Sequence, residues 1–445
     1  MANQSELNHE TFPAFLYDQG DRIGLLKKIL QSLGNPDKRF NIIHICGTNG
    51  KGSTSLMIAA LLRKMNYHVG LFTSPYIGNI YNGIQVDFKN ISNQHFNQKI
   101  SLIEKVLQNP KFNGVKVSAF EAQFLISMLY FADLHVDYVV LECGLGGELD
   151  ATNAVFNTMY SIFTKISLDH VGILGNNITE IATTKSKIIR QNNVTISAQH
   201  QPGEAFRVLE KEAHSKNATF LTANQTVISM ILQTPKSTRV HYVNSQNDEH
   251  QSGTFNFGLV ATYQLENLAT VITWLIDFLN RKKLVYNLNQ LLEDTLLNIV
   301  VPGRFEKISQ QPVIILDGGH NPDGIQAFVK TVNTLYPDSE KLIINGFLKD
   351  KSYESSVKEL ISLKNASFII TEPDNKQREL PPQQLSDVYV KLTKQTYQSF
   401  DSPTDAIQYA VSHATANTII FVIGSFYLLN PIRAYLLSRS DHHEH

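Results

Sequence analysis

Apolar residues follow two alternating patterns along most of this chain. Short aliphatic runs such as 40–46 are typical of buried strands, and they are followed by stretches in which apolar residues recur at helical spacing. Further strands are predicted at 69–73, 137–141, 159–165 and at the start of a strand–helix unit over 194–216. Helices are predicted over 22–33, 93–108, 118–134, 177–190, 263–280 and 287–298, and from Ser53 onward. This alternation predicts an α/β fold built on a parallel sheet.

The pattern changes twice in the second half of the chain. Residues 222–259 alternate only weakly between polar and apolar, which predicts a small irregular β insertion. After Val301 and Pro302 the strand–helix alternation starts again, with strands expected at 313–316, 341–345, 367–371 and 418–423. We therefore predict two domains, residues 1–301 and residues 302–445, of which the second is a smaller, doubly wound, Rossmann-like α/β domain.

The segment between the first strand and its helix, Gly47–Ser53, has the sequence GTNGKGS. Glycines let backbone N–H groups converge on an anion, the helix N-terminus adds partial positive charge, and Lys51 supplies a mobile cation. The usual P-loop has Ser or Thr directly after its lysine, whereas Gly52 stands there in this chain. An ordinary glycine turn is the alternative interpretation. The strand–loop–helix context favours a P-loop NTPase-type domain that binds a nucleoside triphosphate.

Composition excludes several classes of partner. The 39 basic and 40 acidic residues balance, so nothing favours nucleic acid or an anionic membrane. The first ten residues lack the basic and apolar regions of a signal peptide, and the longest apolar stretch, 418–429, is too short to span a bilayer, so we expect a cytoplasmic protein. Cys46 and Cys143 are expected to be reduced thiols. The histidine-rich tail 441–445 is expected to be a solvated appendage rather than a metal site.

Several polar residues stand where predicted strands end, and each has a structural alternative. Glu142 could hold a metal ion beside the glycine loop or cap a turn. His170, taken alone, is more typical of a core or capping residue, and Lys185 is more typical of a solvated helix face. Asp317 and His320 follow the first strand of the second domain and could contact a ligand or form a capped turn.

Motifs in a fixed order along the chain resemble those of the folylpolyglutamate synthase and dihydrofolate synthase family, relatives of the Mur ligases. They are LGNP at 33–36, GTNGKGS at 47–53, TSP at 73–75, GLGG-LDATN at 144–153, LDH at 168–170, PGR at 302–304, DG-HNP at 317–322 and LKDK at 348–351. The resemblance covers the chain almost end to end.

The resemblance implies roles for particular residues. The ATP phosphates would be held by Thr48, Asn49, Gly50, Lys51, Gly52 and Ser53, and the nucleotide would also be contacted by Asn267, Arg304 and Asp317. Two magnesium ions would be bound by residues matching Ser74, Glu142, His170 and Lys185. Lys185 matches a lysine that is carboxylated in the family. A monovalent cation is a further candidate cofactor.

The implied reaction is ATP-dependent addition of L-glutamate to a reduced folate, to dihydropteroate or to both, through an acyl phosphate. Lys51, Arg304 and the magnesium ions would spread the charge of the transferring phosphoryl group, and His320 is a candidate to help deprotonate the amine. The resemblance implies a monomer whose partners are the folate or pterin substrate and glutamate.

Four positions depart from the family pattern on the side expected to face the substrate. Tyr76 and Asn82 stand where the family has His and Glu, Gly83 stands where it has Arg, and Glu148 replaces an arginine. Because a folate is anionic, these changes leave open a ligase of the same mechanism that acts on another carboxylate. A nucleotide-binding homologue without ligase activity is the third possibility, and retention of Lys51, Glu142 and Arg304 argues against it.

Overall fold

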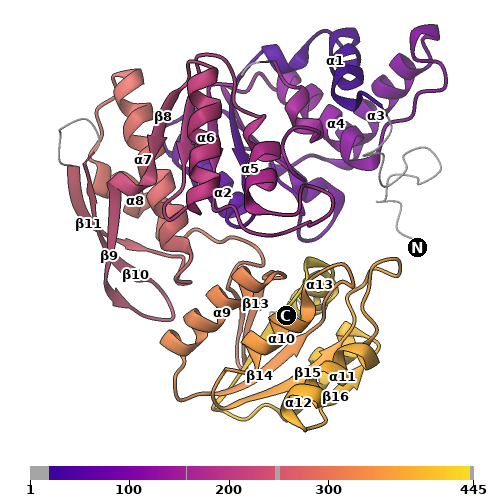
Figure 1. Ribbon diagram of the computed structural model, residues 1–445, viewed down its shortest axis with the longest axis vertical. Helices are drawn as coiled ribbons and strands as arrows, with labels where there is room; N and C mark the ends of the chain where they lie inside the picture. The colour runs from indigo at the N-terminus through magenta and orange to yellow at the C-terminus, as the bar shows by residue number, and fades with distance from the viewer. Residues whose placement is uncertain (1–19, 157, 246–250, 441–445) are drawn as a thin grey trace. The chain divides into compact units, whose positions relative to one another are not determined.

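The computed structural model describes residues 20–156, 158–245 and 251–440, and they form two compact units (Figure 1). The first unit contains the described residues of Met1–Ser229, His241–Phe255 and Glu266–Leu296. The second contains the described residues of Met230–Val240, Asn256–Leu265 and Leu297–His445. The histidine-rich tail lies outside the described residues. In the part of the chain that is described, no helix is both long and apolar enough to cross a membrane.

The first unit is built on an eight-stranded sheet in the order β4-β3-β2-β5-β1-β6-β7-β8. Its strands are β1 Asn41–Cys46, β2 Val69–Phe72, β3 Ile84–Val86, β4 Lys89–Asn90, β5 Tyr138–Glu142, β6 Tyr160–Phe163, β7 Val194–Ser197 and β8 Thr219–Thr222. All neighbours pair in parallel except the edge pairs β2–β3 and β3–β4, which are antiparallel. The predicted parallel sheet is confirmed. Strand β1 is almost entirely apolar because it lies inside the sheet, where both faces of the strand are buried.

Helices cover this sheet. They are α1 Arg22–Ser32, α2 Lys51–Lys64, α3 Asn93–Leu107, α4 Ala119–Asp133, α5 Ile178–Ser186, α6 Gly203–Ser215, α7 Gln264–Lys282 and α8 Leu288–Leu296. Short 3₁₀ turns occur at Pro36–Lys38, Ile80–Gly83, Pro110–Phe112, Ala151–Ala154 and Ala223–Gln225. In Figure 1, α5 and α6 lie side by side in front of the strands. The start of α4 is fixed by a capping box between Ser118 and Glu121, and Glu121 also pairs with the buried Arg22 of α1.

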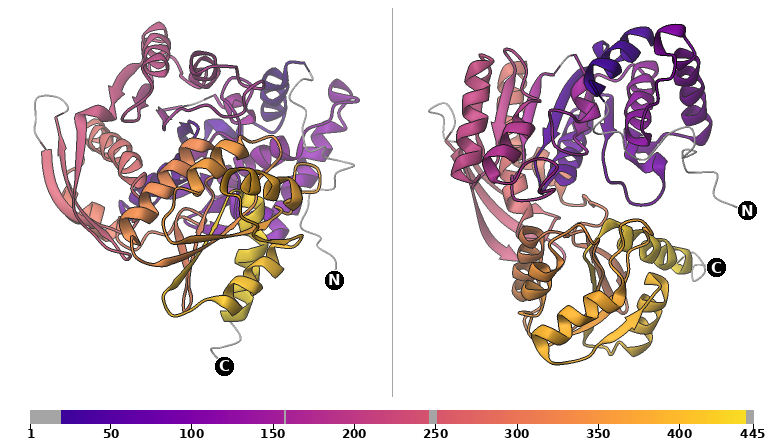
Figure 2. Two further views of the ribbon diagram at one scale, coloured as in Figure 1. Left: turned by 60° about the horizontal axis from the view of Figure 1, so that its bottom comes forward. Right: turned by 45° about the vertical axis from the view of Figure 1, so that its right-hand side comes forward.

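A small three-stranded sheet, in the order β11-β10-β9, follows the main sheet in the sequence. Its strands are β9 Thr226–Gln233, β10 Thr238–Asn244 and β11 Gln251–Phe257. Thr234 N donates to Ser237 O (2.9 Å) in the turn that joins β9 to β10. Figures 1 and 2 show α8 beside this sheet, and Gly253 of β11 packs closely against Asn289 of α8. The predicted small β insertion is therefore confirmed, and its strands form a three-stranded sheet.

The second unit contains a six-stranded sheet in the order β12-β13-β17-β14-β15-β16. Its strands are β12 Glu306–Gln310, β13 Val313–Asp317, β14 Glu340–Asn345, β15 Ala366–Thr371, β16 Gln398–Phe400 and β17 Thr418–Ile423. Its helices are α9 Pro322–Leu335, α10 Tyr353–Leu360, α11 Pro382–Thr393, α12 Pro403–His413 and α13 Phe426–Ser440. All neighbours are parallel except β12 and β13. This confirms the predicted smaller α/β domain and adds two edge strands, β12 and β16.

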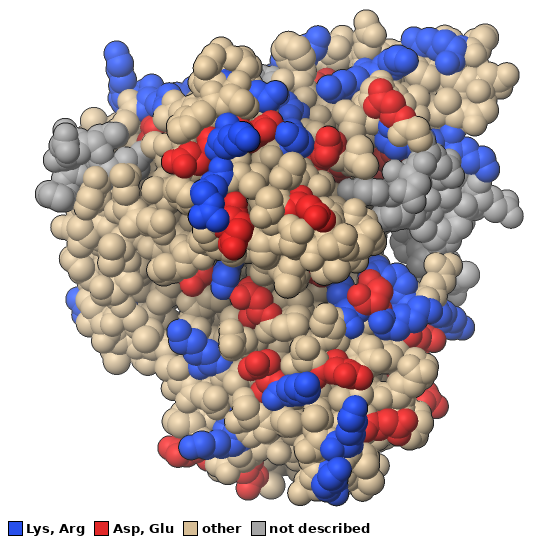
Figure 3. Space-filling model, viewed as in Figure 1, with Lys and Arg blue, Asp and Glu red and all other residues tan. Residues whose placement is uncertain are grey.

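The division of the chain at residue 301 stays a prediction. The last segment of the second unit begins at Leu297, and that unit also takes in two earlier segments, Met230–Val240 and Asn256–Leu265. On the face shown in Figure 3, basic and acidic side chains are interspersed, in keeping with the net charge of -1.

Candidate active site

The glycine loop lies between the end of β1 and the start of α2, as the sequence predicts. Gly47 (φ +150°) and Gly50 (φ +92°) adopt backbone conformations that L side chains rarely adopt. A Cβ at Gly47 would lie 1.9 Å from Thr164 Oγ1, and one at Gly50 would lie 2.1 Å from Asn267 Oδ1. Only glycine therefore fits at either position, and the loop leads directly into the N-terminus of α2, where unpaired backbone N–H groups attract an anion.

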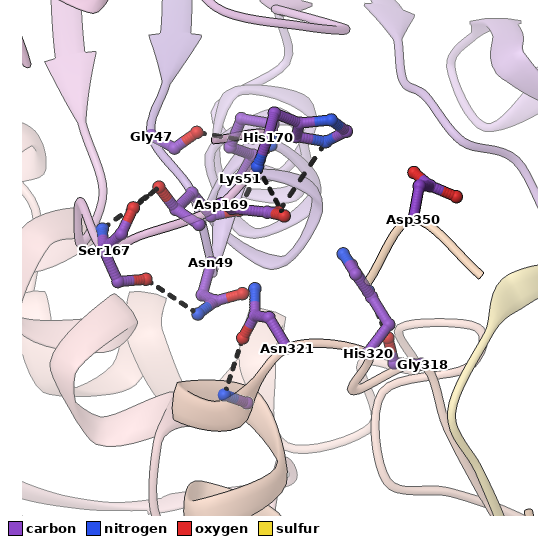
Figure 4. Close-up of polar contacts among 12 residues, drawn as sticks. Gly47, Asn49, Lys51, Ser167, Asp169, His170, Gly318, His320, Asn321 and Asp350 are labelled. Carbon is purple, nitrogen blue, oxygen red and sulfur yellow. Dashed lines mark hydrogen bonds and ion pairs between the residues drawn. The ribbon is translucent and has the colours of Figure 1, made fainter. Parts of the chain in front are cut away.

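Contacts with the segment after β6 fix the loop from one side. Thr48 N donates to Lys165 O (2.9 Å), and Thr48 Oγ1 donates to Ser167 O (3.1 Å). Asn49 Nδ2 donates to Ser167 Oγ (3.4 Å), and Figure 4 shows the two side chains turned toward each other. The Lys51 ammonium lies across the loop, 3.2 Å from Thr48 O and 3.4 Å from Gly47 O. These carbonyl contacts hold the ammonium group across the loop.

Two oxygen-bearing side chains lie close together beside the loop. Glu142, the last residue of β5, is buried, and Ser74 N donates to its Oε2 (3.3 Å). Ser74 Oγ is itself buried and has no hydrogen-bond partner among the described residues. A Cβ at Gly52 would lie 3.5 Å from Glu142 Oε2, so a larger side chain at residue 52 would fill the space beside this carboxylate. A buried hydroxyl without a partner next to a carboxylate fits a hard divalent cation, which takes oxygen ligands.

The other two predicted metal ligands have different surroundings. His170 has a positive φ (+51°), and its Nε2 lies 3.7 Å from Asp169 Oδ2, as Figure 4 shows. No three His, Cys, Asp or Glu side chains within the described ranges converge so as to hold a metal ion. A cation beside Glu142 would therefore rely on the serine hydroxyl and on nucleotide or water oxygens, as Mg²⁺ commonly does.

Lys185 is buried on α5, and its Nζ donates to Gly47 O (2.8 Å). Burial, with the nearby Lys51 charge, lowers the pKa of Lys185. A Cβ at Gly147 would lie 2.6 Å from Lys185 O, so the second glycine-rich segment packs on the lysine backbone. Lys185 is thus fixed between the two glycine segments rather than on a solvated face. The helix that carries it ends at Ser186, earlier than the predicted end at residue 190.

Cys46 and Cys143 are both free and buried, which confirms the expectation of reduced thiols. The Cys143 thiol contacts His44 Nε2 (3.1 Å), and Cys46 Sγ donates to Gly146 O (3.0 Å).

Glu148, which replaces an expected arginine, is exposed.

The candidate residues of the second unit gather at the end of β13. Asp317 is buried, and its carboxylate accepts hydrogen bonds from Gly319 N (2.8 Å), Phe305 N (3.0 Å) and the Tyr263 hydroxyl (2.7 Å). Burial raises the pKa of Asp317, while the Arg304 charge and these hydrogen bonds oppose the rise. His320 Nδ1 lies 2.9 Å from Gly318 O. Asn321, on the same loop in Figure 4, caps α9 through Gly324 N (2.8 Å).

Two residues in this group escaped prediction from sequence. Tyr263 binds Asp317, and the Phe426 ring lies 4.7 Å from the Arg304 guanidinium carbon. No spacing rule signals either residue, because their partners are far away in the sequence. Within the first unit the structure brings together the loop residues, Asn267 and Lys185, and it pairs Ser74 with Glu142; within the second it brings together Arg304, Asp317 and His320.

Two family models match the chain. The Mur ligase middle domain matches residues 45–275, and the Mur ligase glutamate ligase domain matches residues 303–426. The fold and the phosphate loop therefore define an ATP-dependent ligase built from Mur ligase domains.

Individual relatives narrow this class. Dihydrofolate synthase/folylpolyglutamate synthase of Bacillus subtilis (strain 168) is 30% identical over 419 residues, which cover 93% of this chain and 94% of the relative. The chain belongs to the folylpolyglutamate synthase/dihydrofolate synthase family. The expected fold class and ligase activity are thereby confirmed.

Solved structures agree with this assignment at the level of the fold. The Mycobacterium tuberculosis folylpolyglutamate synthase complexed with ADP has a TM-score of 0.84 at 22% identity, covering 96% of each chain. A bifunctional folylpolyglutamate synthase/dihydrofolate synthase with Mn, AMPPNP and L-glutamate bound has a TM-score of 0.79 at 23% identity, covering 93% of this chain and 94% of its own.

Proposed function

We propose that this ligase joins L-glutamate to the carboxylate of a reduced folate, of dihydropteroate or of both. The carboxylate oxygen attacks the γ-phosphorus of ATP, which releases ADP and gives an acyl phosphate. The glutamate amine then attacks the acyl carbon, phosphate leaves, and the amine proton passes to a base. The observation that carries the proposal is the loop Gly47–Ser53 at the N-terminus of α2, with Glu142 and the unpartnered Ser74 hydroxyl beside it.

Residues of the first unit would bind the triphosphate and position the carboxylate that attacks it. Backbone N–H groups of the loop would hold the phosphates, and Lys51 would exchange its long carbonyl contacts for phosphate oxygens. Glu142 and Ser74 would hold a magnesium ion, and His170, with Lys185 once that lysine is carboxylated, would hold a second one. When bound, magnesium neutralises developing phosphoryl charge. Asn267, buried against Gly50, would contact the nucleotide.

Residues of the second unit would supply the remaining nucleotide contacts. Arg304 would stabilise the charge of the transferring phosphoryl group. The Asp317 oxygens already accept three hydrogen bonds, so one acceptor position is left for the nucleotide. His320 would help to take a proton from the glutamate amine, and the 2.9 Å contact of its Nδ1 with Gly318 O would orient the ring for this role.

Lys185 carboxylation is a further part of the proposal. Its Nζ is buried beside Gly47 O at the base of the loop, so a carbamate there would place a new anion next to the phosphate site. The amine nitrogen would bond to the carbon of CO₂ and release a proton. The resulting oxygens would be additional ligands for a cation. We also propose that the ligase binds a monovalent cation and is a monomer.

A second candidate function is a ligase of the same mechanism that acts on a different carboxylate. The exposed Glu148 favours it, because an anion there disfavours a negatively charged folate. Asn82 also differs from the family pattern, and its side chain closes its own loop by donating to Ile77 O (2.8 Å).

The deciding experiment supplies the protein with ATP, magnesium and labelled glutamate, together with dihydropteroate or tetrahydrofolate in separate reactions. Label in either product supports the first function and identifies the pterin. If neither pterin product is labelled but a different carboxylate acquires labelled glutamate in the presence of ATP, the second candidate function would be established. The Lys51→Ala variant is the negative control, because it lacks only the ammonium group proposed to bind the ATP phosphates.

A further inference from the structure

Tyr263 stands at a position where the chain passes between the two compact units. The described residues up to Leu265 in this segment belong to the second unit, whereas Glu266 and the rest of α7 belong to the first. Within the second unit, Ala261 is part of the apolar core, and Thr262 N donates to Thr331 Oγ1 of α9 (3.1 Å). The residues directly before Tyr263 are therefore anchored to the second unit.

The Tyr263 hydroxyl donates to Asp317 Oδ2 at 2.7 Å, shorter than either backbone contact to that carboxylate. Phe305 N donates to the same oxygen, so the backbone next to Arg304 is tied to the carboxylate that Tyr263 holds. Burial and the Asp317 charge raise the pKa of Tyr263, so its hydroxyl keeps its proton and remains a donor.

From these contacts we infer that Tyr263 is a positioning residue of the ligase, which fixes the Asp317 carboxylate and, through the Phe305 backbone, the loop that presents Arg304. This inference rests on the proposed roles of Asp317 and Arg304 in nucleotide binding. Tyr263 acts through Asp317 and need not touch the nucleotide.

The same loop has a second support, which does not involve Tyr263. The Phe426 ring at the start of α13 lies against the Arg304 guanidinium (4.7 Å), a favourable cation–π contact. The Phe426 ring also packs against Gly318, where an added Cβ would come within 2.6 Å of the ring. The guanidinium direction is thus set by Phe426, while Tyr263 sets the carboxylate and the backbone. Loss of Tyr263 alone should weaken the site without abolishing it.

The charged surroundings of Asp317 make the role of the tyrosine measurable. Arg304 lowers the pKa of Asp317, as does the Tyr263 hydroxyl, and both oppose burial. Ionisable groups on the neighbouring backbone include Glu306 at the start of β12, which pairs with Arg433 of α13 (2.9 Å), and His320 in the same loop. Removing the hydroxyl should therefore raise the pKa of Asp317. The loss of ATP binding that accompanies protonation of this carboxylate at low pH, which is the acid limb of the binding profile, should then occur at higher pH.

The test compares Tyr263→Phe with Tyr389→Phe. Tyr389 is also buried in the second unit, and its hydroxyl donates to Asn345 Oδ1 (3.1 Å), so the control removes a similar hydrogen bond at another place. We expect Tyr263→Phe to weaken magnesium–ATP binding about tenfold, as loss of a hydrogen bond to a charged group does, and to shift its acid limb upward. Tyr389→Phe should change thermal stability to a similar extent and leave both readouts unchanged.

Two further variants separate the possible failures. Arg304→Ala with unchanged ATP binding would contradict the proposed function itself. Weakened binding in Arg304→Ala, together with a Tyr263→Phe variant that behaves like Tyr389→Phe, would contradict only the positioning role. In the Asp317→Asn background, Tyr263→Phe should have little additional effect on binding, because both changes break the same contact; full additivity would also contradict the inference.

Discussion

The Asn267 side chain lies so close to Gly50 that a Cβ at residue 50 would come within 2.1 Å of Asn267 Oδ1. Gly50, directly before α2, and the first turn of α7 therefore fit together only when residue 50 is glycine. This contact leads to the first prediction.

Gly50→Ala should destabilise the protein and weaken ATP binding. The backbone cost of the positive φ at a non-glycine residue is about 1–2 kcal/mol, and the new methyl group must also displace the Asn267 amide. Gly114→Ala is the control, because Gly114 has φ +76° and open space around it. Urea unfolding should show a larger loss for Gly50→Ala than for Gly114→Ala, and in an Asn267→Ala background the two losses should become similar. Equal losses in the wild-type background would contradict the close fit.

Lys51→Ala should reduce ligase turnover by ~10²-fold or more while leaving the fold intact, because it removes a cation that acts on the transferring phosphoryl group. Lys64→Ala, at the other end of α2, is the control; Lys64 is half exposed and pairs with Asp294. Steady-state rates and circular dichroism of both variants provide the measurement. Near-normal amide synthesis by Lys51→Ala would refute the phosphate role.

Ser74→Ala should raise the magnesium concentration needed for half-maximal activity without lowering stability. The Ser74 hydroxyl makes no hydrogen bond with any described residue, so its removal leaves no protein group unsatisfied. Ser55→Ala is a matched control, because Ser55 Oγ is also buried without a partner but lies within α2. Magnesium titrations of the two variants should diverge, and a shared response would exclude Ser74 as a ligand.

Carboxylation of Lys185 should be visible directly. With ¹³C-labelled bicarbonate, the protein should show a carbamate carbon resonance that Lys185→Met lacks. Lys187→Met is the control, because Lys187 pairs with Glu212 (3.0 Å) at the end of the same helix. Carbamate formation needs the neutral amine, and burial lowers the pKa of Lys185, so the signal should grow as pH rises through the range below the ordinary lysine pKa. An identical resonance in Lys185→Met would contradict the assignment.

Strand–helix alternation was sufficient to predict the two parallel sheets and the loop between β1 and α2. Long apolar runs such as β1 and β17 are buried on both faces, so their pattern is strong. The short strands β4 and β16 lie at the sheet edges and are largely exposed, so they carry almost no apolar signal. They were missed for that reason.

The site shows the same limit. Residues within one motif, such as Gly47 to Ser53, were predicted because local spacing determines how they cooperate. Tyr263 and Asp317 are separated by 54 residues, and only the folded chain shows that they share a hydrogen bond. The burial of Lys185 could not be predicted from the sequence, because the polar and apolar positions of its helix are compatible with a lysine exposed to solvent.

The second unit is assembled from three separate stretches of the polypeptide, and one of them contains Ala261 and Tyr263. A fragment starting at residue 302 would therefore be missing part of its own apolar interior and the tyrosine partner of Asp317. Gene fusions or domain swaps that exchange only the C-terminal third of this ligase would transplant an incomplete module. A working chimera would have to carry residues 256–265 from the same parent.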